Sequence, residues 1–245
     1  MSFERAALAL LLGLVFGSFV TALVHRVPRG MALLGDRSRC PACGHVLGWR
    51  DLVPLLSWLT SRGRCRHCGQ TISFRYPMIE IASALLVLLV AARQAEPLAA
   101  ALLALMAVLL LAIALIDLEK RIIPNRLLLA LLPIGLAYRL TVDADPLDML
   151  GGLALALALG LGLAFGYAKL RGRPGLGMGD VKFLALAGLV LGFSGFPVFL
   201  LLAGLLGVVT GLGWRLAGRG SRFPFGPALA ATLLIVLLFP SLSRL

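Results

Sequence analysis

Two aspartates, Asp117 and Asp180, stand where long apolar runs end or begin, and their side chains could act together. Asp117 closes one run, and Asp180 opens another directly after the glycine-rich segment 175–179. If the fold brings two carboxyl groups within a few Å, their mutual repulsion makes them share one proton. The ionised member can then take a proton from water while the protonated member polarises a peptide carbonyl. The pair therefore predicts acid–base hydrolysis of a peptide bond.

The glycine-rich segment would let another backbone approach Asp180 closely. Gly177 and Gly179 have no Cβ, and Pro174 ends any preceding helix before the next apolar run. Asp180 thus falls in the first turn of a predicted membrane helix, where an ionisable side chain is a functional candidate. The same position also suits a helix cap, because aspartate accepts hydrogen bonds from the unpaired N–H groups there. For Asp180 alone, both interpretations remain open.

All four cysteines lie in one polar segment, residues 25–76, as two C-x-x-C pairs separated by 21 residues: Cys40, Cys43, Cys65 and Cys68. This spacing is close to that of zinc sites, in which four thiolates surround one ion tetrahedrally. Such a closed site is structural, and it would stabilise a segment that has little core of its own. Four reduced structural cysteines, or a disulfide pair, are the alternatives. His45 and His67 lie beside the pairs and are interpreted as bystanders.

The composition is that of a polytopic membrane protein. Of 245 residues, 60% are hydrophobic, and the mean hydropathy is +0.99, whereas soluble domains are roughly 45–50% apolar. A net charge of +12 would suggest nucleic-acid binding in a soluble protein. In a membrane protein it first indicates topology, because cytoplasmic loops collect lysine and arginine. We therefore expect membrane lipid as a partner and no nucleic acid.

Eight apolar runs could form membrane helices, at about residues 6–24, 77–92, 98–116, 127–140, 147–170, 181–193, 197–216 and 227–239. Alternate loops between them hold 19 of the 23 lysines and arginines, and only Arg5, Arg93, Arg139 and Arg244 fall on the other side. The basic loops are predicted to be cytoplasmic, with both termini outside. This topology places Asp117 and Asp180 at the same cytoplasmic edge of the bilayer. Asp143, Asp145 and Asp148 share one outside loop and are expected to be solvated.

Two other function classes would also account for paired acids in a membrane protein. A transporter could use them as a proton relay, but the chain shows no internal repeat, and the acids lie at the membrane edge rather than its middle. A structural scaffold would leave the glycine-rich acid loop unexplained. The small-residue patterns at Gly188 and Gly192, and at Gly207 and Gly211, are expected to reflect packing.

Several motifs together resemble the type IV prepilin peptidases, which are G-x-G-D aspartyl proteases. The second-aspartate motif reads Gly177-Met178-Gly179-Asp180-Val181-Lys182, and Asp117 is followed by Ile123-Pro124-Asn125. The cysteine-containing segment resembles their N-terminal cytoplasmic domain, ending in Arg75-Tyr76-Pro77-x-x-Glu80. Gly17-Ser18-Phe19 and Pro224-Phe225-Gly226-Pro227 match family positions near the two ends. The resemblance covers nearly the whole chain.

The resemblance implies that Asp117 and Asp180 are catalytic, with Gly177, Gly179 and Lys182 in the supporting loop. Members of this family remove the basic leader of prepilins and type II secretion pseudopilins at the cytoplasmic face of the bacterial inner membrane. Many then N-methylate the new terminus with S-adenosylmethionine. Peptidase activity without methylation remains the alternative. The chain departs from the family's usual asparagine at Thr21 and Leu52, and no motif locates the residues that bind S-adenosylmethionine.

The predicted fold is all-α, with about eight transmembrane helices. We expect a first transmembrane helix in residues 1–24, a cytoplasmic zinc-knuckle insert in 25–76 and a seven-helix membrane domain in 77–245, which carries both aspartates.

Overall fold

The structure, a computed structural model, describes residues 1–33, 37–172, 175–220 and 223–244. Within these ranges the regular secondary structure consists of helices and two isolated β-bridges, Arg39–Val46 and Arg64–Thr71. The chain divides into two compact units, Met1–Ala95 and Glu96–Leu245. The predicted all-α fold is confirmed. The predicted division into a first helix, an insert and a seven-helix domain stays a prediction. Three residues used in that analysis, Arg173, Pro174 and Arg222, lie outside the described ranges.

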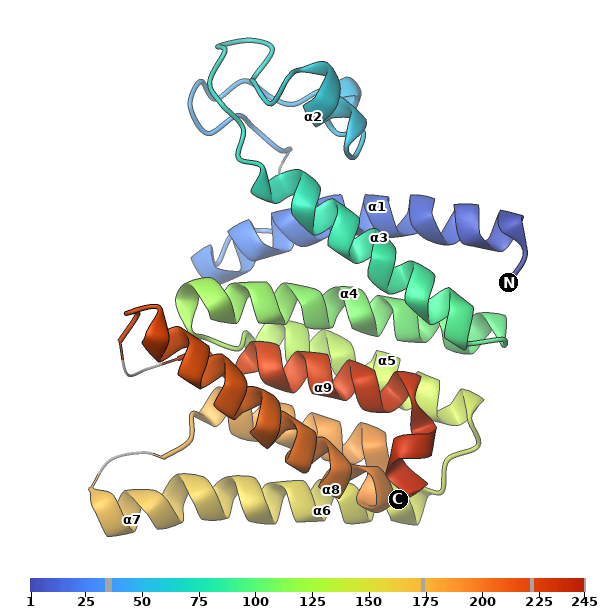
Figure 1. The fold of residues 1–245 in the computed structure, drawn as a ribbon, viewed down its shortest axis with the longest axis vertical. Helices are drawn as coiled ribbons and strands as arrows, with labels where there is room; N and C mark the ends of the chain where they lie inside the picture. Colours follow the sequence, from blue (N-terminus) through green and yellow to red (C-terminus); the bar gives the residue numbers. More distant parts are fainter. Residues whose placement is uncertain (34–36, 173–174, 221–222, 245) are drawn as a thin grey trace. The chain divides into compact units, whose positions relative to one another are not determined.

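The first unit is built on two long helices, α1 (Phe3–Arg26) and α3 (Arg75–Arg93), which pack against each other (Figure 1). Their backbones come very close. A Cβ on Gly17 would lie 2.5 Å from the Cα of Glu80, and a Cβ on Gly13 would lie 2.5 Å from the Cα of Ala84. Glycine is therefore required at this crossing. Between the two helices, the insert forms only short turns of helix: η1 (Val27–Arg29), η2 (Trp49–Asp51) and α2 (Leu56–Thr60).

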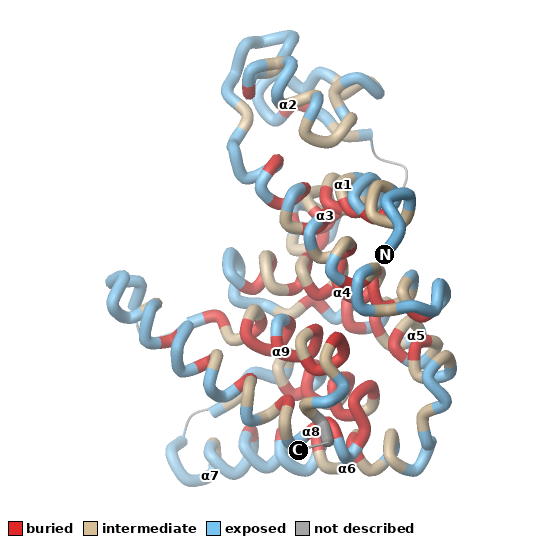
Figure 2. Tube along the Cα trace, turned by 45° about the vertical axis from the view of Figure 1, so that its right-hand side comes forward, coloured by how far each residue is buried: buried red, intermediate tan, exposed pale blue. Residues whose placement is uncertain are grey.

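The second unit is a helical bundle around α4 (Pro97–Lys120). This helix is apolar on all sides and packs against α5 (Asn125–Thr141) and α9 (Gly226–Leu238). Figure 2 shows that the buried residues of this bundle concentrate on α4 and α9. The remaining helices are α6 (Pro146–Leu161), the π-helical η3 (Gly162–Gly166), α7 (Tyr167–Arg171), α8 (Met178–Leu216) and η4 (Pro240–Arg244).

Helix α8 contains the sixth and seventh predicted runs, joined at a break. Gly192 has φ 78° and ψ 177°, a backbone conformation that only glycine adopts readily, and Pro197 follows five residues later. Just beyond the break, the Ser194 N–H donates to Asp148 Oδ1 at 3.1 Å. Asp148 also lies 3.5 Å from Arg139, so the expectation that Asp148 is solvated was wrong. Its carboxylate caps the second half of α8 from the start of α6.

Among the described residues, five helical segments are long and apolar enough to cross a membrane: Phe3–Arg29, Arg75–Arg93, Pro97–Lys120, Pro146–Arg171 and Met178–Leu216. Large apolar side chains on their outer faces are exposed, among them Leu11 and Leu201, as expected of a surface that contacts lipid. Helices α5 and α9 are shorter, with 17 and 13 residues. The multi-pass character is confirmed, and the count of eight spans stays a prediction.

The glycines at 188, 192, 207 and 211 do serve packing, as expected. Gly188 faces α6, where a Cβ would lie 2.6 Å from that of Ala156 and collide with the Gly152 carbonyl oxygen. Gly207 and Gly211 instead receive the rings of Phe225 and Phe223, from the connection between α8 and α9. Close approach of α6 to the first half of α8 fixes the helix that holds Asp180 in its first turn.

We predict that Gly188→Ala destabilises the protein, whereas Gly204→Ala does not, because Gly204 has nothing within 4 Å of its Cβ position. Both changes bring the same gain in helix propensity, so the difference isolates an overpacking cost of about 1–3 kcal/mol. Thermal unfolding followed by circular dichroism in detergent should give a lower midpoint for Gly188→Ala only. Equal midpoints for the two variants would contradict the close packing of α6 on α8.

Candidate active site and metal centre

Asp117 lies in the last turn of α4, with only 5% of its surface exposed. Its Oδ2 accepts a hydrogen bond of 2.7 Å from the backbone N–H of Gly226, the first residue of α9. The first N–H groups of a helix have no partner within that helix, and they favour an anion. The N-terminus of α9 therefore supplies both a donor and a favourable dipole to the buried carboxyl group.

Gly226 is required at this position for a steric reason. A Cβ there would lie 2.7 Å from Oδ2 of Asp117 and 2.9 Å from its Cβ. Glycine alone lets the α9 backbone reach the carboxylate, and Pro227 then fixes a helical φ in the first turn without needing an N–H partner. The sequence motif around Gly226 matched family positions, but its link to Asp117 was missed.

Asp180 occupies the third position of α8, and its half-buried carboxylate accepts from the backbone N–H of Gly177, the N-cap residue. This is half of a capping box, in which Asp180 is the third helical residue and Gly177 is the N-cap. The carboxylate also lies close enough to Asp117 for the two charges to repel each other. Asp180 therefore caps its helix and also faces a second acid.

The supporting residues join the two aspartate motifs. Gly179 packs on the segment that follows Asp117, where a Cβ would lie 3.2 Å from Cβ of Ile123. Lys182 Nζ donates to Asn125 Oδ1 at 3.0 Å, which ties the first turn of α8 to the start of α5. The predicted residues Gly177, Gly179 and Lys182 thus gather around the two acids. The ends of α4, α5, α8 and α9 together make the candidate site.

The four cysteines also converge, in the insert of the first unit. Their sulfur atoms all lie within 4.8 Å of one another, and no disulfide joins these described residues. The Sγ atoms of Cys40 and Cys68 are 3.9 Å apart, and sulfurs bound tetrahedrally to one Zn²⁺ would be about 3.8 Å apart. The cluster could therefore hold one metal ion. His45 and His67 stack on each other, with ring centroids 4.6 Å apart.

Two matching turns position the sulfurs. In the first, the Cys40 N–H donates to the His45 carbonyl and the Gly44 N–H donates to the Cys40 carbonyl, each at 2.9 Å. The second turn repeats this pattern from Cys65 to Gln70, with bonds of 2.8 and 2.9 Å. Gly44 and Gly69 close the turns at φ 71° and 73°, which explains the C-x-x-C-G order in both.

The same turns favour thiolate at one sulfur. The backbone N–H groups of Cys43 and Ala42 lower the pKa of the Cys40 thiol to about 7. The Gln70 N–H likewise lowers the pKa of the Cys68 thiol. Burial and hydrogen bonds to the neighbouring sulfurs outweigh it and raise the pKa of Cys68 to about 11. In the metal-free cluster, Cys40 ionises first, and thiolate is the form that binds metal.

Comparison with known proteins now decides the family. Residues 11–94 match the family model described as the bacterial peptidase A24 N-terminal domain. Residues 104–212 match that of the type IV leader peptidase family. The chain belongs to the type IV leader peptidase family. Both aspartates fall inside the second match, and all four cysteines fall inside the first.

Curated relatives of this leader peptidase family extend over nearly the whole chain. A prepilin leader peptidase/N-methyltransferase of Aeromonas salmonicida (strain A449) is 34% identical, covering 95% of this chain and 90% of the relative. A protein of the same name from Burkholderia pseudomallei (strain K96243) is 37% identical, covering 93% and 83%. Another from Stutzerimonas stutzeri is 33% identical, covering 94% and 89%. No solved structure matches the chain.

We predict about one tightly bound metal ion per chain, measured by mass spectrometry on protein purified without chelator. The double variant Cys40→Ser/Cys65→Ser should retain less than a tenth of it, because two of the four ligands are lost. His67→Ala is the matched control and should keep its metal, since four sulfurs already complete the site. Undiminished metal in the double variant would show that the ion is bound elsewhere.

Proposed function

We propose that this chain is a membrane aspartyl endopeptidase that removes the leader of type IV prepilins or type II secretion pseudopilins and then N-methylates the new terminus. The observation that carries the proposal is the convergence of Asp117 and Asp180 in a chain whose relatives are named prepilin leader peptidase/N-methyltransferase. Prepilins or pseudopilins are the proposed macromolecular partners. No finding favours the transporter or the scaffold.

The proposed cleavage step needs both carboxyl groups. The ionised one accepts a proton from water, and the resulting hydroxide attacks the carbonyl carbon of the scissile peptide bond. The protonated one donates to the carbonyl oxygen, and the C–N bond breaks as the leaving nitrogen gains a proton. The Gly226 N–H donates to Asp117, and the Gly177 N–H donates to Asp180, so a backbone donor holds each side chain. This route forms no covalent enzyme intermediate.

We further propose that the site faces the cytoplasm of a bacterium, with the chain in the inner membrane and both termini outside. The helix ends around the two aspartates carry Lys120, Arg121, Arg126 and Lys182, and cytoplasmic loops collect such charges. The substrate's leader is expected to reach the site from the same side. Arg121 lies over the ring of Trp214, 5.8 Å from its centroid, an aromatic contact typical of the membrane interface.

The metal that we propose for the thiol cluster is zinc, with a structural role. Four sulfur ligands and no open position are typical of structural zinc sites. Cytoplasmic cysteines stay reduced and are available for such a site. The ion would stabilise the insert, whose longest helix has five residues. It would take no direct part in cleavage.

The methyltransferase activity requires S-adenosylmethionine, and cleavage supplies its acceptor. Hydrolysis converts a peptide nitrogen into a free α-amine, whose lone pair can accept the methyl group. The relatives' names join the two activities. Peptidase activity alone is the alternative, and assaying the two reactions separately on one prepilin peptide would distinguish them.

We predict that Asp117→Asn and Asp180→Asn each reduce cleavage of a prepilin peptide by at least a thousandfold, because either change removes a proton-transfer group. Asp143→Asn is the matched control, since this exposed acid lies in the loop between α5 and α6 and should leave cleavage within a fewfold of the wild type. Membrane insertion is verified for each variant. Near-normal cleavage by either of the first two variants would disprove the two-aspartate mechanism.

Gly226→Ala should also reduce cleavage, by about tenfold to a hundredfold, because a methyl group would displace Asp117 from its N–H donor. Gly213→Ala is the control, since nothing lies within 4 Å of its Cβ position. Peptide cleavage rates and thermal midpoints are measured for both variants. A Gly226→Ala protein that cleaved as fast as Gly213→Ala would show that this contact does not position Asp117.

A further inference from the structure

The insert of the first unit exposes large apolar side chains, although it is predicted to lie outside the membrane. Trp49 in η2 is 73% exposed, and Leu56 and Leu59 in α2 are 59% and 60% exposed. Leu56 and Leu59 are three residues apart and so share one face of α2, while η2 packs against α2. Together these three side chains make an apolar patch. A patch of this kind indicates contact with a partner or a membrane.

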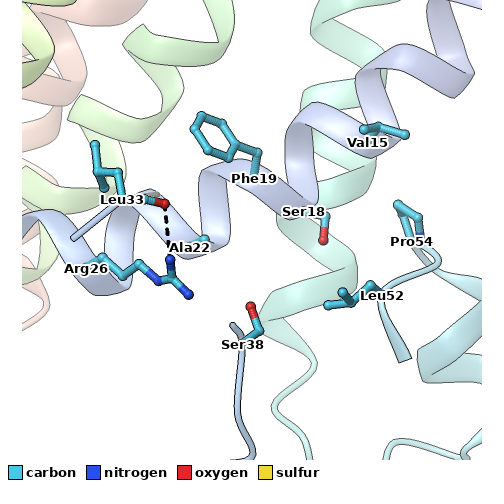
Figure 3. Close-up of a pocket in the computed structure, with 9 residues that line it drawn as sticks. All are labelled: Val15, Ser18, Phe19, Ala22, Arg26, Leu33, Ser38, Leu52 and Pro54. Atoms are coloured by element: carbon cyan, nitrogen blue, oxygen red, sulfur yellow. Dashed lines mark hydrogen bonds between the residues drawn. The ribbon is translucent and has the colours of Figure 1, made fainter. Parts of the chain in front are cut away.

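The patch does not take part in the packing of the insert on α1. Figure 3 shows Leu52 and Pro54, which precede α2, across a pocket of about 300 Å³ from Val15 and Ser18 of α1. The chain before α2 therefore faces the first long helix. Neither leucine of the patch lines this pocket, so both are left for another contact.

Contacts with α3 and the segment before it fix the orientation of α2. The Trp58 ring, in α2, meets the Phe74 ring edge to face, with centroids 5.5 Å apart. Its Nε1 donates to the Ile72 carbonyl at 3.2 Å. Directly before α2, the Leu55 N–H donates to Oε2 of Glu80 at 2.8 Å, and Glu80 is a buried residue of α3. The patch therefore has a fixed orientation relative to α3.

The patch continues a lipid-facing stripe of α3, which is long and apolar enough to cross a membrane. Met78, Ile81 and Leu85 are all exposed, and their spacing of three and four residues places them on one helical face. Phe74 lies four residues before Met78 and is exposed as well. Because Phe74 also contacts Trp58, an apolar surface runs from the membrane span onto α2.

The charge of the insert suits the headgroup region of a bilayer. Residues 25–76 hold nine arginines and two aspartates, a formal charge of +7, and one zinc ion with four thiolates would still leave about +5. Asp51 lies 3.6 Å from Arg66, and the Arg50 guanidinium lies over the Trp49 ring, 5.1 Å from its centroid. Tryptophan rings are enriched at the membrane interface, and arginine side chains reach from there to the lipid headgroups.

We propose that the apolar patch docks the insert on the lipid bilayer, with Trp49, Leu56 and Leu59 at the level of the upper acyl chains and Arg50 on a lipid phosphate. A bilayer fits better than a protein partner because the patch is continuous with the outer face of a membrane span. The insert is also tethered at both ends, to α1 and to α3, so it stays close to the membrane surface. Docking needs neither a substrate nor a cofactor, and it goes beyond the function proposed above.

Quenching of Trp49 fluorescence by brominated lipid tests this docking. Trp58→Phe/Trp214→Phe leaves Trp49 as the only tryptophan of the chain and keeps an aromatic ring against Phe74. The full-length protein is placed, one chain per disc, in nanodiscs of phosphatidylethanolamine and phosphatidylglycerol, with or without bromine on the acyl chains. Bromine quenches tryptophan only at close range, so it should remove at least half of the emission. If this variant does not fold, the loss of quenching in Trp49→Phe of the otherwise unchanged chain gives the same quantity.

Leu56→Gln/Leu59→Gln, made in the same protein, removes apolar area from the patch without changing a buried residue, and it should reduce the quenching at least twofold. Met31→Gln is the matched control, because Met31 is an exposed apolar residue of the insert outside the patch, and it should leave the quenching unchanged.

Three results would overturn the proposal. Trp49 emission that aqueous iodide quenches and brominated lipid does not would show that the patch faces water. Emission that is shielded from iodide only when prepilin peptide or a second chain is added would show a protein-docking surface instead. Full quenching by brominated lipid in the double glutamine variant would show that the two leucines do not hold the insert on the bilayer.

Discussion

The hydrogen bond from the Gly226 N–H to the Asp117 carboxylate is the constraint on which the candidate active site depends. A buried carboxyl group is unfavourable by several kcal/mol unless donors surround it. The donor here is a backbone amide, so α9 must begin within hydrogen-bond reach of the end of α4. The packing of α9 along α4 and the glycine at its start both follow from this requirement.

Asp180 is positioned differently, through the helix that it caps. The first half of α8 is fixed along its length by the close contact of Gly188 with Ala156. At its far end the chain breaks at Gly192, where Asp148 accepts from the Ser194 N–H. An acid therefore stands at each end of this half-helix, one facing Asp117 and the other fixing the break. The broken helix places Asp180 without any direct bond between the two catalytic candidates.

The sequence predicted best what short-range contacts determine. The metal cluster follows from two C-x-x-C-G turns, whose hydrogen bonds join residues at most five apart, so spacing alone indicated it. The position of Asp180 in the first turn of a helix was predictable for the same reason. By contrast, Gly226 lies 109 residues from Asp117, and Glu80 lies 25 from Leu55. The periodicity of apolar residues cannot show which distant groups pair. For the same reason the sequence did not predict the contacts of Asp148 with Ser194 and Arg139.

The same difference in range distinguishes the aspartate site from the thiol cluster. In the second unit, the aspartate site is assembled from the ends of α4, α5, α8 and α9, which are far apart in the sequence. In the first unit, the described residues of the insert form almost no apolar core. A metal bound to the thiol cluster would fix both turns of this insert at once.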